Sequence, residues 1–417
     1  MRSSTMIRTP IAALSASALL GLSACTGGGP DAGSDQGDET VTVWHYFTED
    51  RQVQVLEDYK ESFENAHDGA SVENVFVPYD QMNSKLLSGA GSGEGPDVAI
   101  FNGAETASIA LGGALAPIDE QWSSYEDADQ FPESILHTVD EELYSVQGYV
   151  NLLGLWYNAD ILEEIGVQPP TTMEELEDAM AAAVDAGYGG VTLTGLPNTQ
   201  GEWQAYPFLS EAGFDYDSSE ESALAEALTR VESWVSEGWL SQEAASWDQT
   251  VPFDEFTAGD QAFAVNGNWQ RGSVAEDADF DYGVVPLPLG DTGGVYLGGE
   301  GIGIGSNADD PELAWEYLTS THLSTDGSLS ALETVGYLPA RRDAATDDAV
   351  TSDEILAPFS ETVDEYGAAY PSEEIPAESV ADVQLAVAQA WSATIGGQKD
   401  PETAASDAFS TLEGLLE

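Results

Sequence analysis

Hydrophobic positions near the start of the chain follow two different periods, which predict a strand and then a helix. Over residues 41–47 they alternate, as they do in a half-buried strand. Over residues 52–67 they recur four apart, at Val55, Tyr59 and Phe63, which is the spacing of one helix face. The two elements therefore follow one another as strand and helix.

The alternation of strands and helices continues along the chain. Thr172 and Glu175 have the spacing of a capping box, which marks the start of one of the predicted helices. This order favours an α/β fold with helices layered on a largely parallel sheet. The further predicted elements are a strand over 72–79, a helix over 80–89 with Asp80 as N-cap and Gly89 after its end, a strand over 96–105, a strand over 153–158 and a helix over 169–187.

Residues 282–305 interrupt the pattern with a Pro- and Gly-rich stretch, consistent with a segment that crosses between domains. The elements on either side of residue 150 form two α/β sets of comparable size. We therefore expect two α/β lobes with a cleft between them.

The N-terminus has the layout of a secretory signal. Arg2 and Arg8 precede an apolar run over 11–22, which is short for a membrane span. The sequence LSAC, which ends at Cys25, resembles the bacterial lipobox, and Cys25 is the single cysteine of the chain. We expect a lipoprotein signal peptide over 1–24, lipid on Cys25 and a flexible tether over 25–40. The alternative is an ordinary signal peptide with an incidental cysteine.

The charge of the chain narrows its possible partners. It has 76 Asp and Glu against 10 Lys and Arg, a net charge of −66. Such a surface repels nucleic acid and anionic lipid, so direct binding to either is not expected. With 42% hydrophobic residues the chain still has ample material for packed cores.

Most catalytic motifs are missing from the sequence. It has no P-loop, no HExxH and no GxSxG, and GGEGIGIGS lacks the third glycine of a dinucleotide fingerprint. The four histidines are far apart and form no metal-ligand motif. We expect no catalytic residue, no metal and no cofactor. The histidines are His45, His67, His137 and His322.

Aromatic residues beside polar ones mark four predicted loops. They are Tyr46 beside His45, then Trp203, Trp247 and Trp269. In open α/β sheets the ligand crevice lies beyond the carboxyl ends of the strands, where such loops gather. A sugar suits this lining, since its C–H face stacks on a ring while its hydroxyls bond polar side chains. By contrast, Trp234, Trp315 and Trp391 fall in periodic helices and are expected in the core.

Several segments resemble the bacterial extracellular solute-binding proteins of carbohydrate ABC transporters, the maltose-binding-protein-like group. The most specific is LWYNADILEEIGVQPPTTMEELEDA. The others, in order along the chain, are GEGPDVAIFN, NGNWQ, VVPLPLG, GGEGIGI, AWEYL, GYLPARRD and IGGQKDPETAASDAF.

The resemblance implies a two-lobed periplasmic-binding-protein-like fold of type II, with the ligand in a cleft that closes by hinge motion. It implies an N-terminal lobe of 41–150 and 287–325 and a C-terminal lobe of 151–286 and 326–417. The implied crossings are Tyr149–Leu152, Val285–Leu289 and Ser324–Gly327. A membrane permease would receive the ligand and another subunit would hydrolyse ATP. We expect a monomer, anchored on the outer face of the cell membrane.

The resemblance also implies a set of ligand-binding residues. Trp203, Trp247 and Trp269 would be stacking platforms, and Gly298 and Gly299 would allow close backbone approach. The full set is His45, Tyr46, Asp80, Gln81, Asn102, Glu105, Trp203, Trp247, Asn268, Trp269, Gly298, Gly299, Glu300, Tyr337 and Arg342.

Two other functions stay open from the residues alone. The same fold could bind a non-sugar solute such as a polyol phosphate or a peptide, although the loops offer few basic residues for a phosphate. A secreted carbohydrate-active enzyme would share the aromatic cleft and would need a pair of carboxylates across it.

Overall fold

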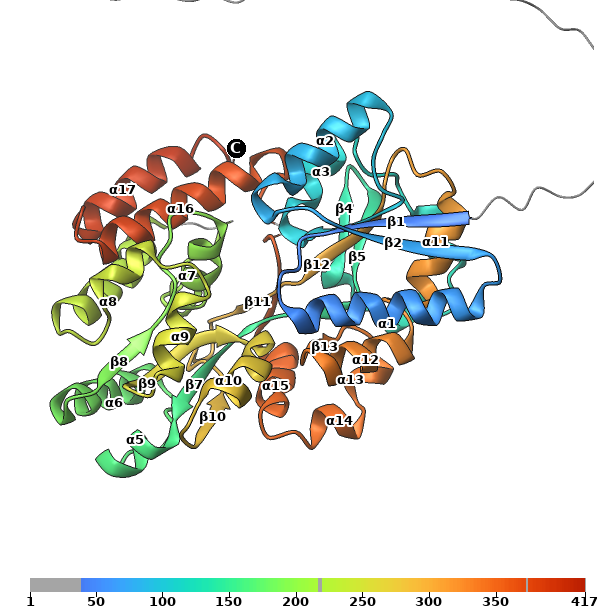
Figure 1. The fold of residues 1–417 in the computed structure, drawn as a ribbon. Helices are drawn as coiled ribbons and strands as arrows, with labels where there is room; N and C mark the ends of the chain where they lie inside the picture. The colour runs from blue at the N-terminus through green and yellow to red at the C-terminus, as the bar shows by residue number, and fades with distance from the viewer. Residues whose placement is uncertain (1–38, 217–219, 373, 417) are drawn as a thin grey trace, which may run out of the picture. The chain divides into compact units, whose positions relative to one another are not determined.

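The computed structural model describes residues 39–216, 220–372 and 374–416, which belong to one compact unit, Asp38–Glu417 (Figure 1). The expected signal peptide, Cys25 and nearly all of the expected tether lie outside the described residues. None of the described helices combines the length and the apolar character needed to cross a bilayer.

One part of the unit is built on a six-stranded mixed sheet. β1 runs parallel to β2 and β3, but β12 lies antiparallel between β3 and β5, so the expectation of a largely parallel sheet is wrong. The reason is that β12 returns late in the sequence and enters the sheet from the opposite end. The strand order is β2 (Ala70–Phe76), β1 (Glu39–His45), β3 (Val98–Asn102), β12 (Glu300–Ile304), β5 (Glu142–Gln147) and β4 (Leu136–Val139).

Helix α1 (Asp50–Ala66) covers this sheet because its apolar face is buried, including the predicted Val55, Tyr59 and Phe63. The other helices on this side are α2 (Met82–Ser92), α3 (Thr106–Leu111), α4 (Asp119–Ser124), α11 (Pro311–Ser320) and α12 (Thr325–Thr334), with 3-10 turns η1 (Tyr79–Gln81), η2 (Gly103–Glu105), η3 (Ala128–Gln130) and η4 (Glu133–Ile135).

Helix α2 has other ends than the sequence predicts. A 3-10 turn occupies Tyr79–Gln81, so the N-cap of α2 is Gln81 rather than Asp80. At the other end Gly89 lies inside the helix, and Gly93 ends it with a left-handed φ of 74°. Glycine adopts this conformation without steric cost, so either Gly89 or Gly93 could end the helix in this way.

The second part is built on a four-stranded sheet in the order β10 (Tyr282–Val285), β7 (Leu153–Asn158), β9 (Gln261–Gly267) and β8 (Gly189–Thr192). Only β8 and β9 run parallel among these described pairs. Its helices are α5 (Ala159–Ile165), α6 (Met173–Ala186), α9 (Val251–Thr257), α10 (Arg271–Asp277) and α15 (Leu356–Tyr366), with the turns η5 (Gln242–Ser246) and η6 (Asn268–Gln270).

The predicted N-cap of α6, Thr172, is confirmed, although only half of the predicted capping box forms. The side chain of Thr172 accepts a hydrogen bond from the backbone N–H of Glu175 at 3.2 Å. The carboxylate of Glu175 accepts from the backbone N–H and the hydroxyl of Thr171 rather than from Thr172. The helix then buries Met173, Leu176 and Met180.

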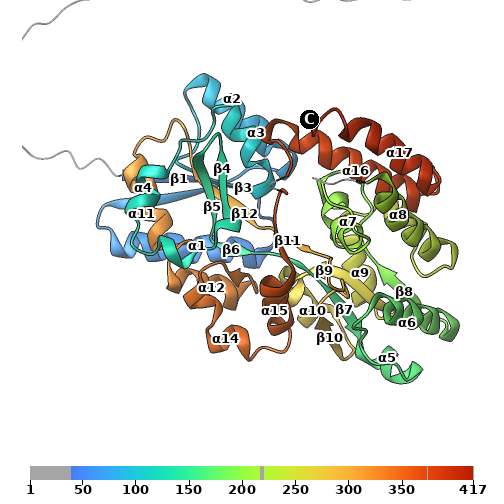
Figure 2. The ribbon, with the colours of Figure 1, turned by 180° about the vertical axis from the view of Figure 1, so that it is seen from behind.

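A helical layer joins the four-stranded side, as both ribbon views show (Figures 1 and 2). Trp234 and Trp391 are fully buried in it, as expected, whereas Trp315 in α11 is only half-buried. The layer consists of α7 (Thr199–Glu211), α8 (Glu221–Ser236), α16 (Val380–Ile395) and α17 (Pro401–Leu412).

The chain passes between the two sheets after β5 and again after β10. The first passage contains β6 (Tyr149–Val150), which pairs with β13 (Leu338–Pro339). The second contains β11 (Val295–Leu297), which pairs with β14 (Gly367–Ala369). Asn151 and Gly298 hold the two passages together by exchanging two backbone hydrogen bonds of 2.8 and 2.9 Å.

The remaining short helices are α13 (Arg342–Ala345), α14 (Asp348–Thr351) and the turn η7 (Ala377–Ser379). The expected third crossing at Ser324–Gly327 forms the N-cap and first turn of α12, which packs against α1. The exact division of the chain into lobes therefore stays a prediction.

Candidate functional site

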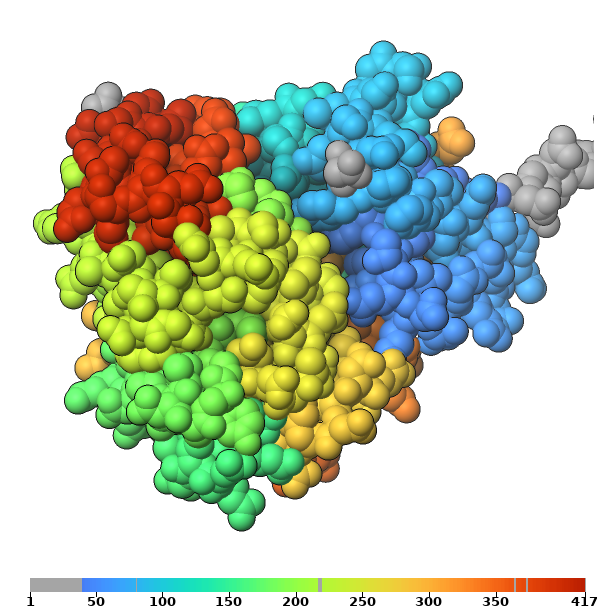
Figure 3. All heavy atoms as spheres, turned by 60° about the vertical axis from the view of Figure 1, so that its left-hand side comes forward, coloured from blue at the N-terminus to red at the C-terminus, as the bar shows by residue number. Residues whose placement is uncertain are grey.

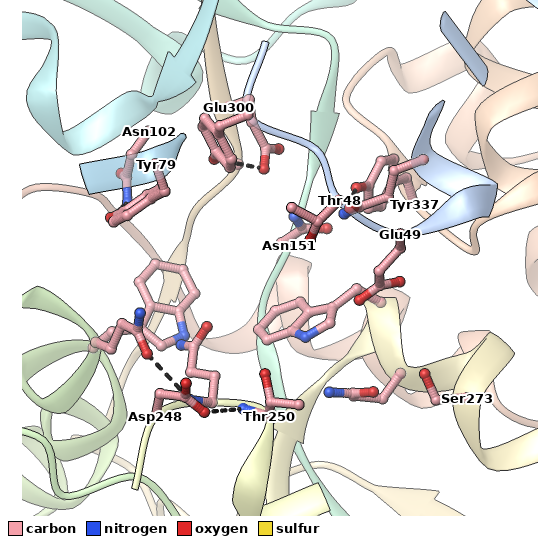
Figure 4. A pocket seen from close by; sticks show the side chains of 18 of the residues that line it. Thr48, Glu49, Tyr79, Asn102, Asn151, Asp248, Thr250, Ser273, Glu300 and Tyr337 are labelled. Atoms are coloured by element: carbon pink, nitrogen blue, oxygen red, sulfur yellow. Dashed lines mark hydrogen bonds between the residues drawn. The ribbon is translucent and has the colours of Figure 1, made fainter. Parts of the chain in front are cut away.

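A cavity of about 380 Å³ lies where loops from the two sheets face each other. In Figure 4 Asn102 and Tyr79 lie on one side of the open space and Asp248 and Thr250 on the other. From outside, the yellow surface of α9 and α10 adjoins the blue surface of β1 and α1 (Figure 3). The lining residues are Tyr46, Thr48, Glu49, Gln52, Tyr79, Asn102, Asn151, Thr199, Gln200, Trp203, Asp248, Gln249, Thr250, Asp254, Trp269, Gln270, Ser273, Asp277, Gly299, Glu300, Tyr337 and Tyr370.

The six-stranded sheet positions one wall. β1 and β3 end at the edge of the sheet where the antiparallel β12 begins, so Tyr46, Asn102 and Glu300 meet there. The Tyr46 hydroxyl donates to Oε1 of Glu300 at 2.9 Å. Nδ2 of Asn102 donates to the hydroxyl of Tyr79 at 3.1 Å. Hydrogen bonds therefore fix four side chains on this wall before any ligand arrives.

Glu300 is a buried carboxyl, with 8% of its surface exposed. Burial raises the pKa of Glu300, and the hydrogen bond from Tyr46 opposes the rise. Tyr149 stacks on Tyr337 with ring centres 4.0 Å apart, and Gln52 donates to the Tyr337 hydroxyl at 2.6 Å. A polar and aromatic network thus joins α1 to the first passage between the sheets.

The opposite wall carries two tryptophans. Trp203 comes from α7 and is 7% exposed, and Trp269 comes from η6 and is half-buried. The Trp203 ring lies edge-on to Tyr370 at 4.6 Å and beside Tyr296 at 5.8 Å. Packing against Tyr370 and Tyr296 therefore holds the Trp203 indole in place in this wall.

A buried carboxyl lies behind Trp203. Oε1 of Glu202 accepts hydrogen bonds from the hydroxyls of Tyr216 and Tyr296, each at 2.8 Å. Nε2 of Gln384 reaches Oε2 of Glu202 at 3.4 Å. Burial raises the pKa of Glu202 to about 7, against the effect of these three donors. The network ties α7 to β11 and α16 underneath the cavity wall.

The cavity is acidic. Its described lining includes five carboxyl residues and no Lys, Arg or His. Burial, and then the nearby charges of Asp277 and Asp248, raise the pKa of Asp254. No three His, Cys, Asp or Glu side chains of the described residues lie close enough together to hold a metal ion. The cavity suits a ligand that offers hydrogen-bond donors and carries no negative charge.

The structure brings seven of the predicted site residues into this one cavity: Tyr46, Asn102, Trp203, Trp269, Gly299, Glu300 and Tyr337. Seven others lie outside its lining: His45, Gln81, Glu105, Trp247, Asn268, Gly298 and Arg342. Of Asp80 only the backbone is described, so its side chain lies outside the description. The role of each residue in binding stays a prediction.

Four of the residues outside the lining have other contacts. His45 is buried in β1, and Glu105 accepts a hydrogen bond from Asn83 at 2.7 Å. Arg342 is exposed and donates to the backbone carbonyl of Asp129. Asn268 is fully buried and accepts from the N–H of Leu152 at 3.0 Å.

Asn268 has a structural position that its sequence context did not suggest. Besides accepting from Leu152, its amide group donates to the carbonyl of Gly336 at 3.2 Å and to that of Val150 at 3.4 Å. The side chain therefore links the four-stranded side to the first passage and to the segment before β13.

Trp203 reaches the cavity from a helix and not from the predicted loop. Asn198 caps α7 by accepting from the N–H of Gln200 at 3.0 Å, and the helix continues through Pro207. Pro207 and Gly201 are unfavourable in the interior of a helix. Tertiary packing of α7 against α16 overrides that local preference.

Sequence reasoning missed most of the polar lining. A signal was present for part of it, since Asp248, Gln249 and Thr250 directly follow Trp247, and Tyr79 directly precedes Asp80. Tyr370 carried no such signal, because it lies in a segment distant from every predicted strand end.

Comparison with known proteins identifies the family of this chain. The family described as bacterial extracellular solute-binding protein matches residues 58–358. The maltodextrin-binding protein of Bacillus subtilis (strain 168) is 24% identical over 427 residues, which cover 98% of this chain and 97% of that protein.

Two solved structures share the fold. The GacH receptor of Streptomyces glaucescens, solved unliganded and with acarbose, superposes with a TM-score of 0.81 at 23% identity, covering 91% of this chain and 98% of that one. The cyclic alpha-maltosyl-1,6-maltose binding protein of Arthrobacter globiformis gives 0.75 at 25% identity, covering 91% and 99%. The periplasmic-binding-protein-like fold expected from the sequence is thus confirmed. Since the match covers most of its length, the chain belongs to the bacterial extracellular solute-binding proteins, a family of binders rather than enzymes.

Proposed function

We propose that the protein captures a sugar or oligosaccharide in this cavity and delivers it to the membrane permease of an ABC importer. The observation that carries the proposal is the composition of the lining, which combines six aromatic rings with amide, hydroxyl and carboxyl groups. The rings offer flat apolar surface to sugar C–H faces, and the polar groups offer partners to hydroxyls. The rings are those of Tyr46, Tyr79, Trp203, Trp269, Tyr337 and Tyr370.

The charge of the lining favours a neutral sugar over an anionic solute. Phosphate and sulfate groups need cationic partners or clustered N–H donors, and the described lining has no basic side chain. Five carboxyl residues instead accept hydrogen bonds from hydroxyl groups. This argues against the polyol phosphate that the sequence left open.

Closure around the ligand would take place at the passages between the sheets. Binding favours the closed form only as far as the ligand contacts it better than the open form. We place the hinge in the paired segments that contain Asn151 and Gly298. A lipid on Cys25 would keep the protein at the outer face of the membrane, near its permease.

The relatives suggest which sugars to test first. Proteins of similar sequence and fold carry names that refer to maltodextrin and to cyclic alpha-maltosyl-1,6-maltose. Glucose oligosaccharides are therefore the first candidates.

The test is a thermal-shift screen of the purified protein against neutral sugars, sugar phosphates and short peptides, followed by calorimetry on each hit. A ligand at one hundred times its Kd adds about 2.7 kcal/mol to the free energy of unfolding. We expect a neutral sugar to stabilise the protein and to be recovered unchanged. Stabilisation by sugar phosphates or peptides alone would contradict the carbohydrate assignment, and recovery of a cleaved sugar would contradict a transport role.

A further inference from the structure

The outer edge of the Trp203 ring lies directly on the backbone of Gly298. A Cβ atom on Gly298 would lie 2.1 Å from Cη2, 2.4 Å from Cζ3 and 3.2 Å from Cζ2 of Trp203. The first two distances are too short for non-bonded carbon atoms, so any larger residue at Gly298 must displace either the ring or the backbone.

The backbone at Gly298 has little freedom to move. Its N–H and carbonyl are both bonded to Asn151, at 2.9 and 2.8 Å, and the next carbonyl, that of Gly299, accepts from the N–H of Gly103 at 3.1 Å. These bonds join two passages and the loop after β3. The ring is therefore the part that would have to give way.

The other sides of the ring are also fixed by neighbours. Tyr370 meets the Trp203 ring at an angle of 80°, and Tyr296 lies beside it. Tyr296 is itself held by Glu202 through its hydroxyl and by the stacked ring of Tyr206 at 3.6 Å. On the edge that faces Gly298, the ring meets backbone and not a side chain.

We infer that Gly298 is a positioning residue, which seats the Trp203 indole at the cavity wall in the orientation that a sugar face would contact. The inference rests on the proposed function for the nature of the ligand. It differs from the sequence-based expectation, in which Gly298 gave the ligand itself close access to the backbone.

The experiment compares G298A, W203F and the double variant in the full chain. Phe lacks the outer ring atoms that a Cβ on residue 298 would strike, so W203F makes room for the methyl group. The matched control is G294A in the same segment, where a Cβ would meet its nearest atoms at ordinary distances of 3.5 and 3.6 Å.

The first readout does not depend on a ligand. Tryptophan is replaced by 4-fluorotryptophan, whose fluorine is on Cε3 and not on the ring atoms nearest Gly298, and the ¹⁹F resonance of Trp203 is assigned by its loss in W203F. We expect G298A to shift this resonance and G294A to leave it in place. An unchanged Trp203 resonance in folded G298A would overturn the inference.

The second readout is the affinity for maltotriose by calorimetry. We expect G298A to weaken it about tenfold, and the double variant to bind no more weakly than W203F alone, since the two changes act through the same ring. Additive losses would overturn the inference. If the unmodified chain does not bind maltotriose, that result counts against the proposed ligand, and the ¹⁹F shift alone decides the role of Gly298.

Discussion

The guanidinium group of Arg51 pairs with the carboxylate of Glu276 across the boundary between the two halves of the site. Arg51 lies at the start of α1, on the six-stranded side, and Glu276 lies in α10, on the four-stranded side. Gly272 of α10 leaves room for the guanidinium, because a Cβ there would lie 2.6 Å from Arg51 Nη1. The cavity residues Gln52 and Ser273 directly adjoin these contacts.

We predict that R51A weakens ligand binding slightly and makes it less sensitive to salt. Both side chains are well exposed, at 42% and 67%, so the pair contributes about 1 kcal/mol or less. A loss of about threefold in affinity at low ionic strength is expected, measured by calorimetry with and without added salt. K399A is the matched control, since the Lys399–Asp407 pair has similar exposure and lies within one side. Equal effects of the two variants would contradict the prediction.

We predict that W269A weakens sugar binding about tenfold or more, because it removes a ring that faces the cavity. W247A serves as control. Trp247 is also half-buried but lies outside the lining, so its loss should leave the affinity within about twofold. Calorimetry with a sugar hit measures both, and thermal unfolding verifies that both variants fold. A larger loss for W247A than for W269A would show that the ligand lies elsewhere.

We predict that E202Q flattens the dependence of stability on pH between about 4.5 and 7. The ordinary pKa of 4.5 applies to the unfolded chain, and burial raises the pKa of Glu202 to about 7 in the folded chain. The folded chain therefore keeps a proton that the unfolded chain has released. This proton contributes about 3 kcal/mol to the free energy of unfolding. The contribution is fully present below pH 4.5 and is lost as pH rises through 7.

The measurement is the free energy of unfolding by denaturant at pH 5 and pH 8, for the original chain and for E202Q. Between pH 5 and pH 8 the free energy of unfolding should fall more for the original chain than for E202Q. E177Q is the control, since Glu177 is a partly exposed carboxylate that bonds Trp234 at 2.9 Å outside the cavity. A constant difference between the original chain and E202Q would rule out Glu202 as the titrating group.

We predict that H322F reduces the loss of stability in acid. Both ring nitrogens of His322 are buried without a hydrogen-bond partner, and burial lowers its pKa from 6.5 to about 3. Below pH 6.5 His322 becomes protonated in the unfolded chain but stays neutral in the folded chain. This lowers the free energy of unfolding by about 2 kcal/mol at pH 5. Denaturant unfolding at pH 7 and pH 5 measures this. H322F should lose less stability than the original chain over that interval, and an equal loss would refute the assignment.

Local patterns were sufficient to predict the elements that carry their own signals. Helix α6 was predicted from Thr172 and the spacing of its buried residues, and it begins one residue after that cap. Strand β7 was predicted over the residues that it occupies, 153–158. Short-range propensity and burial of one face decide these cases.

Part of the site was predictable because some of its residues lie at or beside the ends of strands. Tyr46 directly follows β1, and Asn102 is the last residue of β3. Tyr370 and Thr199 reach the cavity through packing of distant segments, which no local pattern encodes. The same cause misplaced Trp247, whose neighbours line the cavity while its own ring packs against the core.

The position of β12 between β3 and β5 has a consequence for how the chain acquires its fold during synthesis. The six-stranded sheet stays divided until Glu300–Ile304 has been made, although its other five strands precede residue 148. All four strands of the other sheet are synthesised during that interval, so the second sheet has the chance to form first. Contacts between segments so distant in sequence form slowly, so we expect the six-stranded sheet to be completed last.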